Sequence, residues 1–196
     1  MDRIPCGIKV VLASKSPRRR EYTAKICDNF SVITEDTDET LPADIHPRDG
    51  VRVLAERKGE AVIAAHPSDC ADALVIAADT LVELNGEPFG KPADIQDAVR
   101  MLCALRGRTH NVHTGIAVFY HGCMLSATDS SAVIFRLCSD EEISEYAASG
   151  ECMDKAGAYG IQGLGGRLVA GLDGEFDTVV GFPTKKALEL IEEILK

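Results

Sequence analysis

Several cations crowd the start of a predicted helix in the segment SKSPRRR at residues 14–20. Pro17 is typical of the first turn of a helix, and the helix dipole favours negative charge at that end. Backbone amides, two hydroxyls and guanidinium groups together supply directed hydrogen-bond donors and positive charge. The segment therefore predicts a cradle for a phosphate group. A basic surface turn is the alternative interpretation.

A lysine interrupts the apolar side of a second predicted helix, from about Pro47 to Ala65. Its apolar residues recur at the i, i+3, i+4 spacing of a buried stripe, and Lys58 lies on that stripe. An inward ammonium group requires an anionic partner, which a bound phosphate or an active-site carboxylate would provide. Alternatively, the long stem of Lys58 carries the charge to solvent.

A carboxylate follows the apolar run ALVIAA at residues 73–78. Asp79 thus stands at the carboxyl end of a predicted inner strand, where open α/β sheets bind their ligands. It would hold a divalent metal or accept a proton from an attacking water, unless it only caps a turn. The Asn85-Gly86 turn predicts a hairpin that would return Lys91 to the same cleft as a phosphate ligand.

Two further segments contain candidate ligands. The acidic stretch at residues 35–39 would supply a metal carboxylate, because magnesium prefers hard oxygen ligands, although such stretches are usually solvated loops. In the glycine-rich segment 158–166, Gln162 would read a base by donating and accepting hydrogen bonds. His110 and His113 are not predicted to form a metal pair, because a three-residue offset on a strand points them to opposite faces.

The elements that must position these residues alternate between strand and helix. Helices are predicted at 17–28, 47–65, 94–105 and 140–149, the last with Ser139 as its cap, and from Pro183 almost to the end. Strands are predicted at 8–14, 30–34 and 73–79, as an antiparallel pair within 109–137 that turns near His121-Gly122, and once within 157–174. This order predicts an α/β fold with a mixed sheet, formed by residues 1–196 as one elongated unit with a central cleft.

Composition limits the classes of partner and compartment. The formal charge of −10 would repel nucleic-acid polymers and anionic membranes, so an anionic substrate requires a local basic pocket. Seven cysteines without a C-x-x-C pair are typical of reduced thiols. We find no signal peptide and no apolar run long enough for a membrane span. These features predict a cytoplasmic protein that acts on neither membranes nor nucleic-acid polymers.

Taken together and in order, the segments resemble the Maf (septum-formation inhibitor) family from Val10 to beyond Pro183. The family's pattern is matched by LASKSPRRREY at 12–22, DE at 38–39, LAERKGEAV at 54–62, AADTLV at 77–82, GKP at 90–92, RTHNVHTG at 108–115, DKAGAYGIQGLGG at 154–166 and VVGFP at 179–183. Two small departures, Gly59 in place of the usual alanine and Phe182 before the last proline, concern packing rather than chemistry.

The resemblance implies a two-lobed architecture like that of Maf proteins and ITPases, and hydrolysis of a nucleoside triphosphate to monophosphate and pyrophosphate with Mg²⁺, Mn²⁺ or Co²⁺. Asp79 matches the proton acceptor and a metal ligand, and Glu39 matches a metal-linked acid. The residues that match triphosphate ligands are Ser14, Arg18, Arg19, Lys58 and Lys91, the two lysines with a catalytic role. Within the family, the branch that prefers dTTP and UTP has a typical set of residues, which here look like Arg18, Thr80 and Gln162.

Three questions stay open at this level. A homodimer is plausible for the family, but no stripe in the sequence marks an interface. A nucleotide-binding regulator of cell division or septum formation would need the cleft without the water-activating acid. A pyrophosphatase for modified purine triphosphates would share the chemistry and differ only in the base.

Overall fold

The computed structural model describes all residues from Met1 to Lys196. A seven-stranded mixed sheet forms its centre, in the order β2-β1-β3-β5-β6-β7 with β4 paired to β3. The strands are β1 (Lys9–Leu12), β2 (Ser31–Val32), β3 (Ala73–Leu84), β4 (Glu87–Phe89), β5 (Thr109–Tyr120), β6 (Cys123–Phe135) and β7 (Val169–Asp173). The α-helices are α1 (Pro17–Ile26), α2 (Pro47–Ala65), α3 (Pro67–Cys70), α4 (Ile95–Leu105), α5 (Asp140–Ala148), α6 (Phe176–Val180) and α7 (Thr184–Ile194), and two 3₁₀ segments are η1 (Ala156–Ala158) and η2 (Gly163–Leu168).

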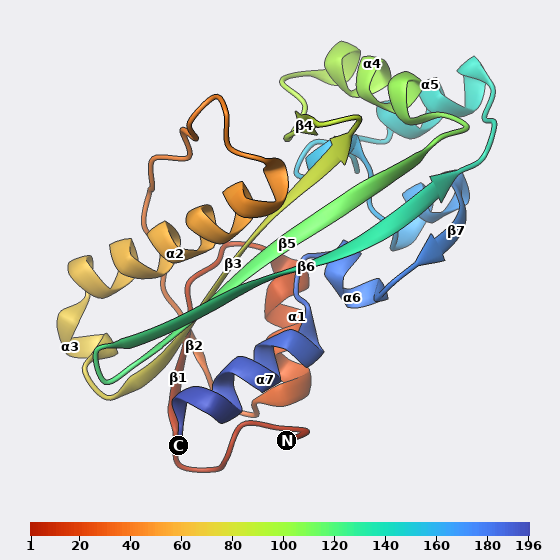
Figure 1. Cartoon of the computed structure of the whole chain (residues 1–196). Coiled ribbons are helices and arrows are strands. Elements are labelled where there is room, and N and C mark those ends of the chain that lie inside the picture. The colour runs from red at the N-terminus through yellow and green to blue at the C-terminus, as the bar shows by residue number, and fades with distance from the viewer.

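Three long strands extend through the whole molecule (Figure 1). The strands β3, β5 and β6 contain 12, 12 and 13 residues, and strands of that length span about 40 Å. Strand β1 pairs with β2 and β3 in parallel, whereas the other pairs are antiparallel. The sheet is therefore mixed, as the sequence predicts.

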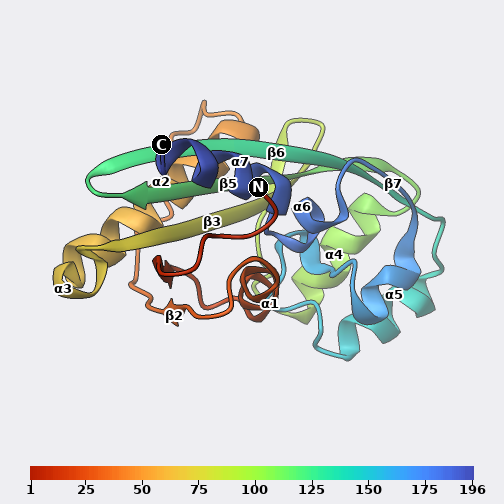
Figure 2. The same cartoon turned by 90° about the horizontal axis from the view of Figure 1, so that it is seen from below.

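Helices cover the two faces of the sheet and one of its ends (Figures 1 and 2). Helix α2 packs on one face through a cluster that includes Ala55, Val62 and Phe119, and α1 and α7 pack on the other face. A third cluster joins α4 and α5 to the far ends of β3, β5 and β6. The elongated, two-lobed fold is thus built on one continuous sheet. No helix in the structure combines the length and apolar character that crossing a membrane requires.

Most local predictions are confirmed. The second helix has the predicted bounds, Pro47–Ala65, and Ser139 caps α5 in a capping box with Glu142. Asn85-Gly86 and His121-Gly122 both have the positive φ angles of tight hairpin turns. Neighbouring strand residues point to opposite faces, so β3 directs Asp79 toward α2 and Thr80 toward α1.

Other elements differ from prediction. The strand predicted at 73–79 continues to Leu84, because its second half pairs with both β4 and β5. The helix predicted to reach residue 28 ends at Ile26, and Cys27 is extended. The glycine-rich segment forms η1 and η2 as well as the one expected strand, β7. Helices α3 and α6 were not predicted, because four and five residues show no helical periodicity.

Gly59 has a packing role that explains its departure from the family pattern. An added Cβ would lie 2.1 Å from Phe119 Cε2. We therefore expect Gly59→Ala to destabilise the fold by about 1–3 kcal/mol through overpacking, although alanine favours helix by about 1 kcal/mol. Urea unfolding measures the change. Gly90→Ala is the control, because its Cβ would meet open space. Recovery of stability in Gly59→Ala/Phe119→Leu supports the explanation, and an unchanged Gly59→Ala midpoint contradicts it.

Candidate active site

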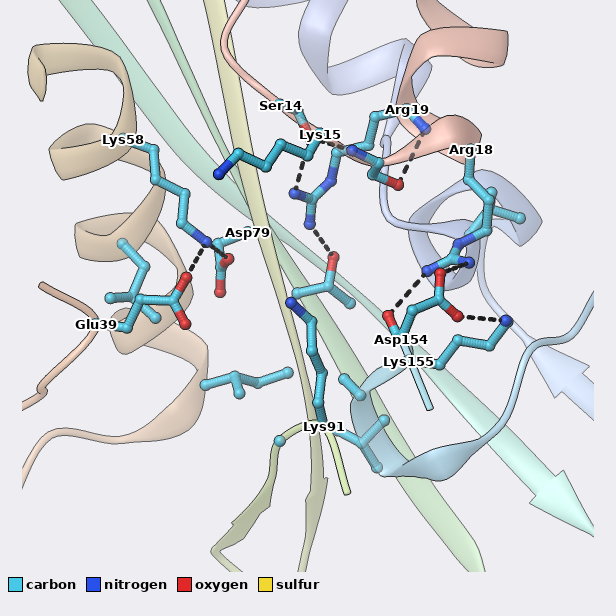
Figure 3. A pocket seen from close by; sticks show the side chains of 18 of the residues that line it. Ser14, Lys15, Arg18, Arg19, Glu39, Lys58, Asp79, Lys91, Asp154 and Lys155 are labelled. Atoms are coloured by element: carbon cyan, nitrogen blue, oxygen red, sulfur yellow. Dashed lines mark hydrogen bonds and ion pairs between the residues drawn. The ribbon is translucent and has the colours of Figure 1, made fainter. Parts of the chain in front are cut away.

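A cavity of about 940 Å³ opens between α1, α2, β3 and the loop that precedes η1 (Figure 3). The predicted site residues that line it are Ser14, Arg18, Arg19, Glu39, Lys58, Asp79, Thr80 and Lys91. The fold thus brings together residues that are spread over positions 14 to 91 of the sequence. Gln162 is half-buried and does not line the cavity, although its neighbours Gly160 and Ile161 do.

The loop after β1 has the geometry predicted for an anion cradle. Ser16 caps α1 by accepting a hydrogen bond from the Arg19 amide, and Pro17 fills the first turn. Ser14 Oγ accepts from the Ser16 amide at 3.2 Å. No acidic residue stands in this first turn, so the positive end of the helix dipole faces the cavity without a compensating carboxylate.

Arg19 is held only by neutral acceptors. Its Nε donates to Gly181 O at 2.9 Å, Nη2 to Thr80 Oγ1 at 3.1 Å, and Nη1 to Ser14 Oγ at 3.4 Å. Burial lowers the pKa of Arg19, with Asp79 acting in the opposite direction, but an arginine stays protonated in proteins. A guanidinium has five N–H donors, so some remain for an anion. Arg19 is therefore a fixed, uncompensated positive charge on the cavity wall.

Arg18 forms an ion pair across the cavity with a residue that sequence reasoning missed. Its Nη1 lies 3.0 Å from Asp154 Oδ2, and Lys155 Nζ lies 2.6 Å from Asp154 Oδ1 (Figure 3). Burial alone would raise the pKa of Asp154, but Lys155 and Arg18 outweigh it and the pKa is lowered. Asp154 is the anion between these two cations, and a substrate phosphate would compete with it. The acid opens the quoted segment DKAGAYGIQGLGG, which was its only signal in the sequence.

Lys58 points inward and joins two carboxylates, which confirms the interpretation of the interrupted stripe. Its Nζ lies 2.7 Å from Glu39 Oε1 and also hydrogen-bonds Asp79 (Figure 3). The Asp79 side chain is only 12% exposed. The hydrogen bond from Lys58 is the main cause that lowers the pKa of Glu39. Two carboxylates thus meet at one cation on the side of the cavity that α2 forms (Figure 3).

This carboxylate pair fits the divalent metal that the family resemblance implies. Both groups are hard oxygen donors, and their shared contact with Lys58 shows that one small cation reaches both. No group of three or more histidine, cysteine, aspartate or glutamate side chains is arranged to hold a metal ion by itself. Magnesium is usually bound through one or two carboxylates, with substrate phosphates and water as the remaining ligands, and that is the arrangement these residues allow.

The lowered pKa of Glu39 predicts a pH dependence of stability. Because the folded state holds the carboxylate more strongly than the unfolded chain does, its contribution is complete above the ordinary pKa of 4.5 and is lost as the pH falls through the folded value. We expect the unfolding midpoint of wild type in urea to exceed that of Glu39→Gln near neutral pH, and the two to converge well below pH 4.5. A difference that persists unchanged in acid would contradict the assignment.

Lys91 follows the β4 hairpin and points into the cavity, as predicted (Figure 3). The carboxylates of Glu39, Asp79 and Asp154 pair with other cations of the cavity wall and not with Lys91, whose charge contributes to the lowered pKa of Glu39. Lys91 therefore adds a second cation that no protein carboxylate neutralises directly.

His110 and His113 have separate, buried surroundings. His110 Nε2 lies 2.8 Å from Tyr159 OH, and burial lowers its pKa to about 4. His113 Nδ1 lies 2.7 Å from Ser130 Oγ, and its other nitrogen faces Glu83. Neither residue lines the cavity, so both act as packing and hydrogen-bonding groups.

Known proteins match this chain over nearly its whole length. A dTTP/UTP pyrophosphatase of Bacillus velezensis is 42% identical over 185 residues, which are 94% of this chain and 96% of the relative. Proteins with the same description from Myxococcus xanthus and Hahella chejuensis are 45% and 43% identical, over 93% and 98% of this chain and 91% and 95% of their own lengths.

The fold has a more distant relative among solved structures. The Ham1 protein of Staphylococcus aureus superposes with a TM-score of 0.55 at 18% identity, covering 95% of this chain and 97% of that one. This likeness shows the fold alone. The family model described as Maf-like protein matches residues 9–194, and the chain therefore belongs to the Maf family.

Proposed function

We propose that this protein is a pyrophosphatase that hydrolyses dTTP and UTP to the monophosphate and pyrophosphate. The observation that carries the proposal is the cavity itself, where a buried carboxylate, Asp79, lies among cations that the protein leaves partly uncompensated. Its full-length relatives are described as dTTP/UTP pyrophosphatases. A triphosphate supplies the negative charge that the cavity lacks. The reaction requires a proton acceptor, which the Asp79 carboxylate would provide.

The triphosphate would lie along the cations of the cavity wall. Ser14 and Arg19 would bind it at the start of α1, Arg18 would exchange Asp154 for a phosphate, and Lys91 would bind from the opposite side. Hydrogen-bond donors that are fixed in place and face the developing charge, in a site with little water, typically make the largest single contribution to the rate enhancement. The cations thus both bind the substrate and offset the charge that grows on the leaving pyrophosphate.

Asp79 would accept the proton of the attacking water. A general base must lie within hydrogen-bond reach of that water, and Asp79 points from β3 into the cavity beside Lys58 (Figure 3). The hydrogen bond from Lys58 orients this carboxylate, and Lys58 would also bind a phosphate of the substrate. Glu39 and Asp79 would hold a divalent cation, Mg²⁺, Mn²⁺ or Co²⁺, which when bound supplies charge neutralisation at the phosphates and an acidified water.

The preference for pyrimidines would come from Arg18, Thr80 and Gln162, by analogy with the dTTP/UTP branch. Arg18 and Thr80 line the cavity, and Gln162 lies next to the lining residue Ile161. We also propose a cytoplasmic location, since reduced thiols and free nucleotides fit a reducing compartment. A homodimer stays a prediction from the resemblance.

A panel of triphosphates tests the proposal. Pyrophosphate release is measured with magnesium or manganese from dTTP, UTP, dCTP, canonical purine triphosphates and modified purine triphosphates. We expect the highest kcat/KM for dTTP and UTP. A preference for modified purine triphosphates would show that the protein is a pyrophosphatase of a different substrate class. Tight binding of the triphosphates without release of pyrophosphate would indicate a nucleotide-binding regulator.

A further inference from the structure

Behind Arg19, a row of polar side chains extends from Thr80 on the cavity wall across three strands of the sheet. Thr80 on β3, Thr114 on β5 and Asp129 on β6 are direct neighbours in the sheet register. Helix α6 crosses this row, and its residue Thr178 contacts both Thr114 and Asp129. Thr114 and Thr178 are completely buried. The row therefore leads from the partly exposed Thr80 on the cavity wall, through the buried Thr114 and Thr178, to the partly exposed Asp129 on β6.

The direction of the hydrogen bonds along this row follows from counting protons. Thr114 Oγ1 lies 2.8 Å from the carbonyl oxygen of Thr178, which can only accept. A hydroxyl group has one proton, so Thr114 must accept at its 3.0 Å contact with Thr80 Oγ1. Thr80 then donates its own proton to Thr114 and turns a lone pair toward Arg19 Nη2, 3.1 Å away.

The same helix holds Arg19 from a second direction. The residue after α6, Gly181, accepts from Arg19 Nε through its carbonyl oxygen at 2.9 Å. Gly181 has a φ of 101°, and a Cβ there would lie 3.0 Å from Thr80 Oγ1. Glycine thus lets α6 approach Thr80 closely, and α6 with Gly181 fixes two of the three acceptors of the guanidinium.

We propose that Thr114 is a positioning residue for the pyrophosphatase reaction, because it fixes the Thr80 hydroxyl as an acceptor that orients Arg19 toward the triphosphate. The inference rests on the proposed function. It assigns Thr80 a role through Arg19, since the Thr80 proton is already engaged and is not available to a phosphate oxygen. Loss of the Thr114 hydroxyl leaves the Thr80 hydroxyl free to rotate, so its lone pair is no longer held toward Arg19.

The test compares Thr114→Val, which keeps the shape and removes the hydroxyl, with Thr114→Ser, which keeps the hydroxyl. We expect Thr114→Val to lower kcat/KM for dTTP by about tenfold, the effect of one lost hydrogen bond to a charged group, and Thr114→Ser to restore most of it. Thr128→Val is the matched control, because its hydroxyl donates to Arg48 O away from this row. Should Thr114→Val not fold, Thr80→Val removes the same acceptor and is expected to show the same loss.

Two further readings separate positioning from a general loss of structure. In an Arg19→Lys background, Thr114→Val should add no further loss, because lysine has no second nitrogen to orient. Affinity for the non-hydrolysable α,β-imido-dUTP should fall in parallel with kcat/KM. Wild type that binds this analogue without releasing pyrophosphate from dTTP would refute the proposed function, while the affinities still test Thr114. Any of three results would overturn the inference. Thr114→Val could bind the analogue as tightly as wild type, or Thr114→Ser could lose as much activity as Thr114→Val. The third is that Thr114→Val lowers kcat/KM as much in the Arg19→Lys background as it does in wild type.

Discussion

Replacing Asp79 with asparagine is expected to lower kcat for dTTP by a factor on the order of 10²–10⁴, the usual contribution of a general base. Asparagine has nearly the same size but cannot take a proton from water. It also keeps one oxygen for Lys58, which contacts Asp79 in the free protein. We therefore expect the folded state to survive and the loss to appear in turnover. Initial rates of pyrophosphate release over a range of dTTP concentrations measure it.

The control for Asp79→Asn is Glu83→Gln on the same strand. Glu83 is as buried as Asp79, at 7% and 8% exposure, but it hydrogen-bonds Asn111 and the Gly86 amide outside the cavity. We expect Glu83→Gln to keep near-normal kcat while it lowers the unfolding midpoint. If Asp79→Asn turned over dTTP at a near-normal rate, another group would be the base, and Glu39 would be the next to test.

Replacing Arg19 with alanine is the second substitution with a large expected effect. The guanidinium is held by three hydrogen bonds to neutral groups, so its charge is available to the substrate. Removal of one preorganised donor typically costs on the order of 10²–10³ in rate, and we expect kcat/KM for dTTP to fall by that amount. Arg19→Lys should recover only part of it, because lysine is a point charge without the planar fork.

Arg20→Ala is the matched control for this helix. Arg20 follows Arg19 directly, but it is exposed and lies outside the cavity. Arg20→Ala removes the same charge from the protein as Arg19→Ala, so any effect of net charge alone appears in both variants. Equal losses in Arg19→Ala and Arg20→Ala would show that only the general field matters and would contradict the specific role of Arg19.

The features that the sequence predicts well are local. Lys58 is recognisable because the helical repeat places it on the buried stripe, and a buried ammonium must find an anion. Asp79 is recognisable because it follows the apolar run ALVIAA, although it lies within β3, which continues to Leu84, and not at the carboxyl end where the sequence placed it. The bounds of α2, the cap of α5 and both tight turns depend on neighbours within a few residues, which is why they are predicted closely.

The features that sequence reasoning misses depend on distant partners. The pairing of Arg18 with Asp154 joins residues 136 positions apart, and no local pattern contains it. The row behind Arg19 requires the register of three strands and the placement of α6, a helix too short to predict. The sequence predicts that Gln162 contacts the ligand, but its neighbours Gly160 and Ile161 line the cavity and Gln162 does not. The role of Gln162 in base recognition is therefore still a prediction.

The position of the bond that is cut tests the central claim most directly. Hydrolysis of dTTP is carried out in oxygen-18 water with magnesium, and the products are separated and analysed by mass spectrometry. Attack on the α-phosphorus predicts one heavy oxygen in the monophosphate and none in pyrophosphate. Label in pyrophosphate, or release of single phosphates with a diphosphate product, would place the attack at another phosphorus and contradict the account.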